Sequence, residues 1–190
     1  MKNGILDVET GDLSSHSKDY IIPNYINFKY NKDAYHADLD CMLNNVSCNN
    51  KEVRSMLEET LGYCLYRENT EQVAIILTGE GKNGKSTILN LFQSVLGEDN
   101  YSSEPLEKLG DRFSLANLFG KLANIADDID SSGKVNNAEF KRVCVKGTQS
   151  AEFKNKDKFK FVSYATPIFT ANSIPRIGQG EDAEAVNRRI

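Results

Sequence analysis

The chain of 190 residues has no tryptophan, only two histidines, four cysteines and four prolines. Its longest unbroken apolar run, residues 73–77, is far shorter than the roughly 20 residues that a membrane-spanning helix needs. Four widely spaced cysteines beside two histidines match neither a zinc site nor a disulfide framework. We therefore expect reduced, buried thiols and no contact with a membrane.

Composition and charge favour a folded protein with one basic surface. An apolar content of 39% and a charged content of 26% are typical of globular chains and argue against disorder. Residues 1–4 lack the apolar core of a signal peptide, so the sequence predicts a cytoplasmic protein. The net charge is −4, yet residues 141–160 carry seven basic and two acidic side chains. This stretch is a candidate contact for a polyanion.

Hydrophobic periodicity divides the chain into two regions. Residues 1–30 are rich in turn formers, and from Asp33 the apolar residues follow helical spacing. A second amphipathic helix follows, with Asn49 or Asn50 as its N-cap. We expect residues 1–70 to form a small, mainly helical region.

Residues 71–190 instead alternate strand and helix signals. Three short apolar runs predict buried strands of a parallel sheet: residues 73–77, 122–126 and 166–171. Helical stretches are expected between them, around residues 106–118 and 137–146. The predicted fold class is α/β, with a central, mainly parallel sheet flanked by helices.

The turn after the first predicted strand matches the phosphate-binding pattern G-x-x-x-x-G-K-[ST], and a helix follows it. Its glycines allow backbone N–H groups to point at phosphate oxygens, and the helix start adds partial positive charge. Lys85 is expected to reach the β- and γ-phosphates of ATP, and Ser86 to ligate Mg²⁺. The alternative is a chance glycine-rich loop. The predicted ATP-binding residues are Gly79, Glu80, Gly81, Lys82, Asn83, Gly84, Lys85, Ser86 and Thr87.

Polar residues follow the other two predicted strands, at the sheet edge where ligands of α/β proteins bind. Asp127 is expected to hold Mg²⁺, and Asp128 to orient or deprotonate the attacking water. Asn172 is expected to hold that water without adding a charge. The alternatives are a solvated acidic turn for the aspartates and a simple turn residue for Asn172.

With these elements in order, the chain resembles a superfamily-three helicase domain, specifically the phage/plasmid primase-helicase family that includes poxvirus-type primase-helicases. The resemblance runs along nearly the whole chain. It rests on the phosphate-binding loop, residues 79–87, which we call the P-loop, and on several shorter segments. These are Asn3-Gly4-Ile5-Leu6-Asp7, Thr10-Gly11, Leu61-Gly62-Tyr63-Cys64-Leu65, Asp111-Arg112-Phe113, Gly120-Lys121, Ala126-Asp127-Asp128 and Ala171-Asn172-Ser173-Ile174-Pro175-Arg176.

The resemblance implies an AAA+-like ATPase that assembles as a homo-oligomeric ring, usually a hexamer, and moves along single-stranded DNA during phage or plasmid replication. It also implies that the protein acts in the cytoplasm of a bacterial host or of a virus-infected cell. In such rings an arginine of the neighbouring subunit completes the ATP site, and Arg188 and Arg189 stand where the family places it. The alternative is an exposed basic end.

The basic stretch gains a role from the same resemblance. Residues 152–161 alternate lysine with phenylalanine about a polar centre, which predicts a β-hairpin. The family carries its DNA-contacting hairpin at this place, so Lys154, Lys156 and Lys158 are the candidate DNA-binding residues. The alternative is a solvated edge hairpin whose lysines deter aggregation. Phe153, Phe159 and Phe161 are expected in the core.

Two departures from the family limit the prediction. The chain stops just after the paired arginines and has no room for a primase domain, so we expect a fragment truncated at its C-terminus. Besides the helicase motor, two other functions are consistent with the sequence: a P-loop enzyme of another class, such as a kinase, and a non-catalytic module that binds nucleotide or DNA.

Overall fold

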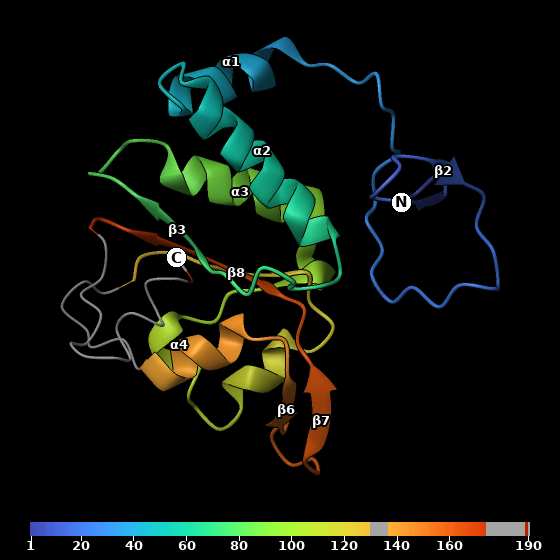
Figure 1. Ribbon diagram of the computed structural model, residues 1–190, viewed down its shortest axis with the longest axis vertical. Coiled ribbons are helices and arrows are strands. Elements are labelled where there is room, and N and C mark those ends of the chain that lie inside the picture. Colours follow the sequence, from blue (N-terminus) through green and yellow to red (C-terminus); the bar gives the residue numbers. More distant parts are fainter. Residues whose placement is uncertain (130–136, 174–188, 190) are drawn as a thin grey trace.

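The computed structural model describes residues 1–129, 137–173 and 189 (Figure 1). Its helices are α1 (Ala37–Val46), α2 (Lys51–Leu65), α3 (Lys85–Leu96) and α4 (Asn137–Cys144), with the short 3₁₀ helices η1 (Glu98–Asn100), η2 (Leu106–Lys108) and η3 (Ser114–Leu118). Its strands are β1 (Ile5–Leu6), β2 (Leu13–Ser14), β3 (Ile75–Thr78), β4 (Tyr101–Ser102), β5 (Ala123–Ala126), β6 (Thr148–Ala151), β7 (Phe159–Val162) and β8 (Thr166–Ala171).

A four-stranded parallel sheet lies at the centre of the molecule, with the strand order β3-β8-β5-β4. The three apolar runs form β3, β8 and β5, which are adjacent strands of this sheet. Their register pairs Thr78 with Ala171 and Ala126 with Phe169. Because the strands are parallel, their carboxyl ends meet at one edge of the sheet. The predicted α/β fold with a central parallel sheet and flanking helices is confirmed.

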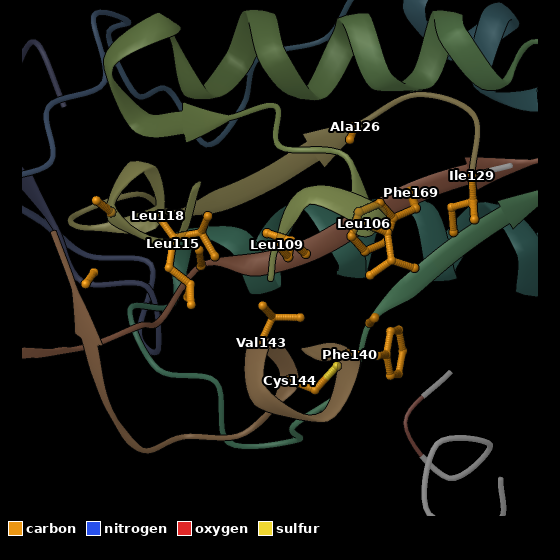
Figure 2. Packing of buried hydrophobic residues seen from close by; sticks show 14 of the residues in the cluster. Leu106, Leu109, Leu115, Leu118, Ala126, Ile129, Phe140, Val143, Cys144 and Phe169 are labelled. Carbon is orange, nitrogen blue, oxygen red and sulfur yellow. The ribbon is translucent and has the colours of Figure 1, made fainter. Parts of the chain in front are cut away.

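The two faces of the sheet bury separate apolar cores because successive side chains along a strand point to opposite faces. Ile125 and Ile168 pack with residues of α2 and α3, whereas Ala126 and Phe169 pack with residues of α4, η2 and η3. Figure 1 shows α2 and α3 on one side of the sheet and α4 on the other. Figure 2 shows Phe140 and Val143 of α4 directed toward the sheet.

The N-terminal region packs against the sheet domain. Asn50 is the N-cap of α2, and its side chain accepts hydrogen bonds from the amides of Glu52 and Val53, as expected from the sequence. Leu57 and Cys64 of α2 share an apolar core with α3. The division into a helical region over 1–70 and an ATPase domain over 71–190 stays a prediction.

The segment before α1 is tied to the sheet domain by buried amide groups. The Asn24 side chain donates to the Asn100 side chain (3.0 Å) and to the Gly120 carbonyl (2.8 Å). Asn100 in turn donates to the Tyr25 carbonyl (2.8 Å). These hydrogen bonds hold a stretch without regular secondary structure against the core.

The helical stretch expected around residues 106–118 is 3₁₀-helical rather than α-helical. It forms two 3₁₀ helices, η2 and η3, separated by residues 109–113. Its buried leucines form two pairs with a spacing of three, Leu106 with Leu109 and Leu115 with Leu118, a spacing that aligns side chains along a 3₁₀ helix.

The hairpin is present, but its first strand lies earlier than predicted. β6 pairs antiparallel with β7, and Ala151 lies opposite Phe159. Residues 152–158 therefore form a loop, which we call the basic loop, instead of continuing the strand. Two contacts accompany this difference: Glu152 is buried against Arg112, and the Phe153 ring stacks on the Phe159 ring, with centroids 5.3 Å apart. Phe161 is buried as expected, whereas Phe153 remains exposed.

None of the described helices combines the length and the apolar composition that a bilayer-spanning segment requires.

The four thiols divide into two classes, so the expectation that all are buried was wrong for two of them. Cys41 and Cys48 are exposed, whereas Cys64 and Cys144 are buried. Burial raises the pKa of Cys64 and of Cys144 to about 12 because it disfavours the thiolate.

We expect iodoacetamide at pH 8 to modify Cys41 and Cys48 in the native protein and to leave Cys64 and Cys144 unmodified. The thiolate is the reactive form, and both thiols with a raised pKa stay protonated at that pH. Mass spectrometry of peptides measures the extent of modification. All four cysteines should react after denaturation, and rapid native modification of Cys64 would contradict its place in the core.

Candidate functional site

The turn between β3 and α3 carries the P-loop and needs glycine at two positions. Gly79 has φ 154°, and a Cβ atom there would lie 1.8 Å from Nδ2 of Asn83. Gly84 has φ 90°, and a Cβ atom there would lie 2.8 Å from a methyl carbon of Val46 at the end of α1. A side chain at either position would disrupt the turn, because both the backbone angles and the space require glycine.

The start of α3 is left available for an anion. Gly84 is its N-cap, no side chain accepts a hydrogen bond there, and the first turn contains no acidic residue. The first N–H groups of a helix have no partner within the helix, and they carry its partial positive charge. This end of α3 therefore suits a phosphate group.

The Lys85 ammonium folds back over the loop. It donates to the carbonyl of Gly79, to the carbonyl of Glu80 (3.3 Å) and to Oδ1 of Asn83 (3.2 Å). All three acceptors are neutral oxygens of the loop itself. An ionised phosphate oxygen is a stronger acceptor for an ammonium, so these contacts are suited to exchange.

The carboxyl end of β5 places two aspartates opposite the P-loop. The hydroxyl of Ser86 donates to Oδ2 of Asp127 at 3.4 Å, which joins the start of α3 to the end of β5. Asp128 follows in a left-handed backbone conformation with φ 46°. Both aspartates are exposed.

One pocket of about 420 Å³ collects these groups, within the roughly 300–1,000 Å³ typical of small-molecule sites. Its lining includes Lys85, Ser86, Asp127, Asp128 and Asn172. The structure thus brings together the side chains that the sequence assigned to phosphate, metal and water. Their individual roles stay predictions.

A second pocket, of about 500 Å³, lies between residues 1–26 and the end of α2. Its lining is mainly apolar and includes Ile5, Ile22 and Leu65. It lacks the glycine turn and the paired carboxylates of the P-loop pocket, so we do not assign phosphate binding to it.

The P-loop pocket fits a metal ion that is shared with a nucleotide. The described residues hold no group of three or more histidine, cysteine, aspartate or glutamate side chains that could bind a metal alone. Mg²⁺ usually takes one or two protein oxygens together with phosphate oxygens and water. The hydroxyl of Ser86 and the carboxylate of Asp127, already in contact, are such a pair.

Of the two predicted arginines, Arg189 is not among the residues that line this pocket. Arg188 lies outside the described residues. The carbonyl of Arg189 accepts a hydrogen bond from the amide of Ala74 (2.6 Å), just before β3. At about 3.3 Å per residue, Ala74 lies roughly 16 Å along the strand from Gly79. Arg189 therefore lies at the amino end of β3, away from the P-loop of its own chain.

The three candidate DNA-binding lysines share one exposed segment. Lys154, Lys156 and Lys158 all lie in the basic loop and are exposed. The ammonium of Lys156 lies 5.7 Å from the centroid of the Phe153 ring. The loop connects to the amino end of β8 through β7, so one short stretch of chain links it to Asn172.

Sequence reasoning missed Thr170, which also lines the pocket. Its hydroxyl donates to Oδ1 of Asp127 and accepts a hydrogen bond from the amide of Asp128 (2.8 Å). The available signal was weak: a hydroxyl residue two positions before Asn172, in a strand that has a second threonine at its start.

Comparison with known proteins gives matches over both regions. The model of a family of unknown function, DUF5906, matches residues 77–189. A model described as D5 N terminal like matches residues 1–62. The protein "Putative helicase L207/L206" of Acanthamoeba polyphaga mimivirus is 26% identical and covers 95% of this chain. The chain spans 20% of the length of that relative.

Solved structures share the fold. Two apo structures of the NrS-1 C terminal region superpose with a TM-score of 0.61. One is 19% identical and covers 75% of this chain and 34% of its own. The other is 17% identical and covers 80% of this chain and 43% of its own. The predicted resemblance to the primase-helicase family is confirmed by these matches taken together, and the chain belongs to the DUF5906 family.

Proposed function

We propose that this chain is the ATP-hydrolysing motor of a DNA helicase that acts in phage or plasmid replication. The observation that carries the proposal is the single pocket in which Lys85, Ser86 and Asp127 converge with Asp128 and Asn172. The similarity to a protein named as a putative helicase supports the same class of activity. In this proposal residues 71–190 form the ATPase domain and residues 1–70 its helical companion.

Binding of ATP begins at the P-loop. The triphosphate lies along residues 79–87, with its oxygens facing the uncapped start of α3. The Lys85 ammonium exchanges its contacts with the carbonyls of Gly79 and Glu80 for the β- and γ-phosphate oxygens. Ser86 and Asp127 hold Mg²⁺, which neutralises charge on the phosphate oxygens when it is bound.

Hydrolysis uses the side chains of Asp128 and Asn172. The Asp128 carboxylate orients the attacking water and accepts its proton, and the neutral Asn172 amide fixes the position of that water. The division of labour between the aspartates follows from their contacts: Asp127 is already joined to Ser86, whereas the Asp128 side chain is free to face the water.

Completion of the site requires a second subunit. Arg189 lies at the amino end of β3, away from the P-loop of its own chain, so in this proposal Arg189 acts at the ATP site of a neighbouring chain. A ring of identical subunits, hexameric by resemblance to the family, provides this arrangement. Arg188 or Arg189 then stabilises the charge that develops on the transferred phosphoryl group.

Single-stranded DNA binds at the basic loop. Lys154, Lys156 and Lys158 are exposed within five consecutive residues, a density that favours contact with successive backbone phosphates. Such contacts do not read the base sequence, which suits a motor that moves along any strand.

Hydrolysis of ATP should be stimulated by single-stranded DNA and should be lost in Lys85→Ala. Removal of the ammonium should weaken ATP binding about 10- to 100-fold, from the ~1.5–3 kcal/mol of a hydrogen bond to a charged group. Phosphate release and binding of a fluorescent ATP analogue measure the two effects. Lys51→Ala, an exposed lysine at the start of α2, is the matched control. Robust hydrolysis that ignores DNA would contradict the motor.

Asp128→Asn should separate binding from hydrolysis. Asparagine tolerates the left-handed backbone of position 128, so the turn should be retained. Hydrolysis should fall about 10²- to 10⁴-fold because the general base is lost, while the affinity for the ATP analogue stays nearly constant. If Asp128→Asn hydrolyses ATP at the normal rate, the water is activated elsewhere.

Lys156→Ala should weaken DNA binding and leave basal ATP hydrolysis unchanged. Loss of one phosphate contact should reduce the slope of log affinity against log salt concentration by about 0.7. Fluorescence anisotropy of a labelled oligonucleotide, titrated at several salt concentrations, measures this slope. Lys160→Ala, on β7 outside the basic loop, tests whether the effect on DNA affinity is specific to lysines of the loop. Equal effects of both variants, or a loss of ATP hydrolysis in Lys156→Ala, would contradict the assignment.

A further inference from the structure

Thr170 is the residue of β8 that faces both aspartates of the P-loop pocket. It is fully buried, in the strand that lies between β3 and β5. A buried hydroxyl is costly unless it is hydrogen-bonded, so its partners are informative about its role.

The direction of each hydrogen bond at Thr170 is fixed by its partners. The amide of Asp128 can only donate, so the Thr170 hydroxyl oxygen accepts from it, at 2.8 Å. The one hydroxyl hydrogen is then directed at Oδ1 of Asp127. The carbonyl of Thr170 also accepts from the amide of Ile129 (2.7 Å).

These contacts make the two oxygens of Asp127 unequal. Oδ1 receives the Thr170 hydroxyl and also lies 3.1 Å from the Asp128 amide. Oδ2 is left facing the Ser86 hydroxyl. A carboxylate anchored through one oxygen has its other oxygen held in a fixed direction, which a metal ligand requires.

The same residue supports the backbone of Asp128. The left-handed conformation at Asp128, with φ 46°, costs energy for a residue other than glycine, so it needs support from its surroundings. The side chain and the carbonyl of Thr170 bind the amides of Asp128 and Ile129, one on each side of the turn.

We propose that Thr170 is the positioning residue for both carboxylates: its hydroxyl aims Oδ2 of Asp127 at the magnesium position and holds the Asp128 turn. The consequence for Mg²⁺ rests on the function proposed above, whereas the positioning itself does not. In this proposal Thr170 acts through the two aspartates and is not itself a ligand of the metal.

Amide hydrogen exchange tests the positioning in the absence of nucleotide. In Thr170→Val the Asp128 amide should exchange roughly five- to tenfold faster, because it loses the shorter of its two hydrogen bonds and keeps only the one to Oδ1 of Asp127. The Ile129 amide, bonded to the main-chain carbonyl, should keep its rate and is an internal control. Thr166→Val, buried in the same strand at its opposite end, should change neither rate. An unchanged Asp128 rate in Thr170→Val would overturn the proposal.

If Thr170→Val does not fold, a comparison of Thr170→Ser with Thr170→Ala tests the same hydroxyl. Both lack the threonine methyl group, and only serine retains the hydroxyl. Thr170→Ser should therefore preserve slow exchange at Asp128, and Thr170→Ala should lose it. Equal exchange rates in these two variants would also overturn the role of the hydroxyl.

The dependence of nucleotide binding on Mg²⁺ tests whether the positioning of Asp127 by Thr170 affects the metal site. The Mg²⁺ concentration for half-maximal binding of a fluorescent ATP analogue should rise about 10- to 100-fold in Thr170→Val, as is typical when the support of a metal ligand is removed. Thr170→Ser should restore it, and binding at saturating Mg²⁺ should approach that of the unmodified protein. An unchanged magnesium dependence would overturn the link to the metal. If the unmodified protein binds no ATP analogue at any Mg²⁺ concentration, the proposed function fails, while the exchange rates still decide the positioning role.

Discussion

The pocket depends on the parallel pairing of β8 with β3 on one side and with β5 on the other. Parallel strands end at the same edge, so the residues that follow the three strands, Gly79, Asn172 and Asp127, are brought together by backbone hydrogen bonds alone. No side-chain contact between them is needed. The position of the site is therefore a property of the sheet, and the side chains determine only its chemistry.

Burial of both faces makes this sheet rigid. Alternate residues of β5 and β8 enter different cores, so neither strand can shift by one residue without exposing apolar side chains and burying the wrong ones. The P-loop benefits from the same packing, since α2 shares a core with α3 and Val46 of α1 lies against Gly84. A loop whose amides must meet phosphate oxygens without a large reorganisation gains from such support.

Prediction from the sequence succeeded where one short segment determines its own structure. The P-loop, the Asn50 cap and β8 depend on local patterns, and the structure places them as expected. Prediction failed where the local structure depends on contacts between residues far apart in the sequence. The start of the hairpin depends on the burial of Glu152 against Arg112, 40 positions earlier in the chain, and exposure of Cys41 depends on which face of α1 is covered. The pairing of Thr170 with Asp127 is of the second kind, because only the sheet register brings these residues together.

The same strand joins the two halves of the proposed mechanism. Residues 159–172 run from the end of the basic loop through β7 and β8 to Asn172. Every residue of β8 is buried, its first four residues pair with β5 and its last four pair with β3. Such a strand moves as a unit or not at all. Coupling also requires an element with two arrangements. In the proposed mechanism the Lys85 ammonium is that element, because phosphate competes with the loop carbonyls for it. A change in nucleotide state would then reach the basic loop through displacement of β8 rather than through local rearrangement within it.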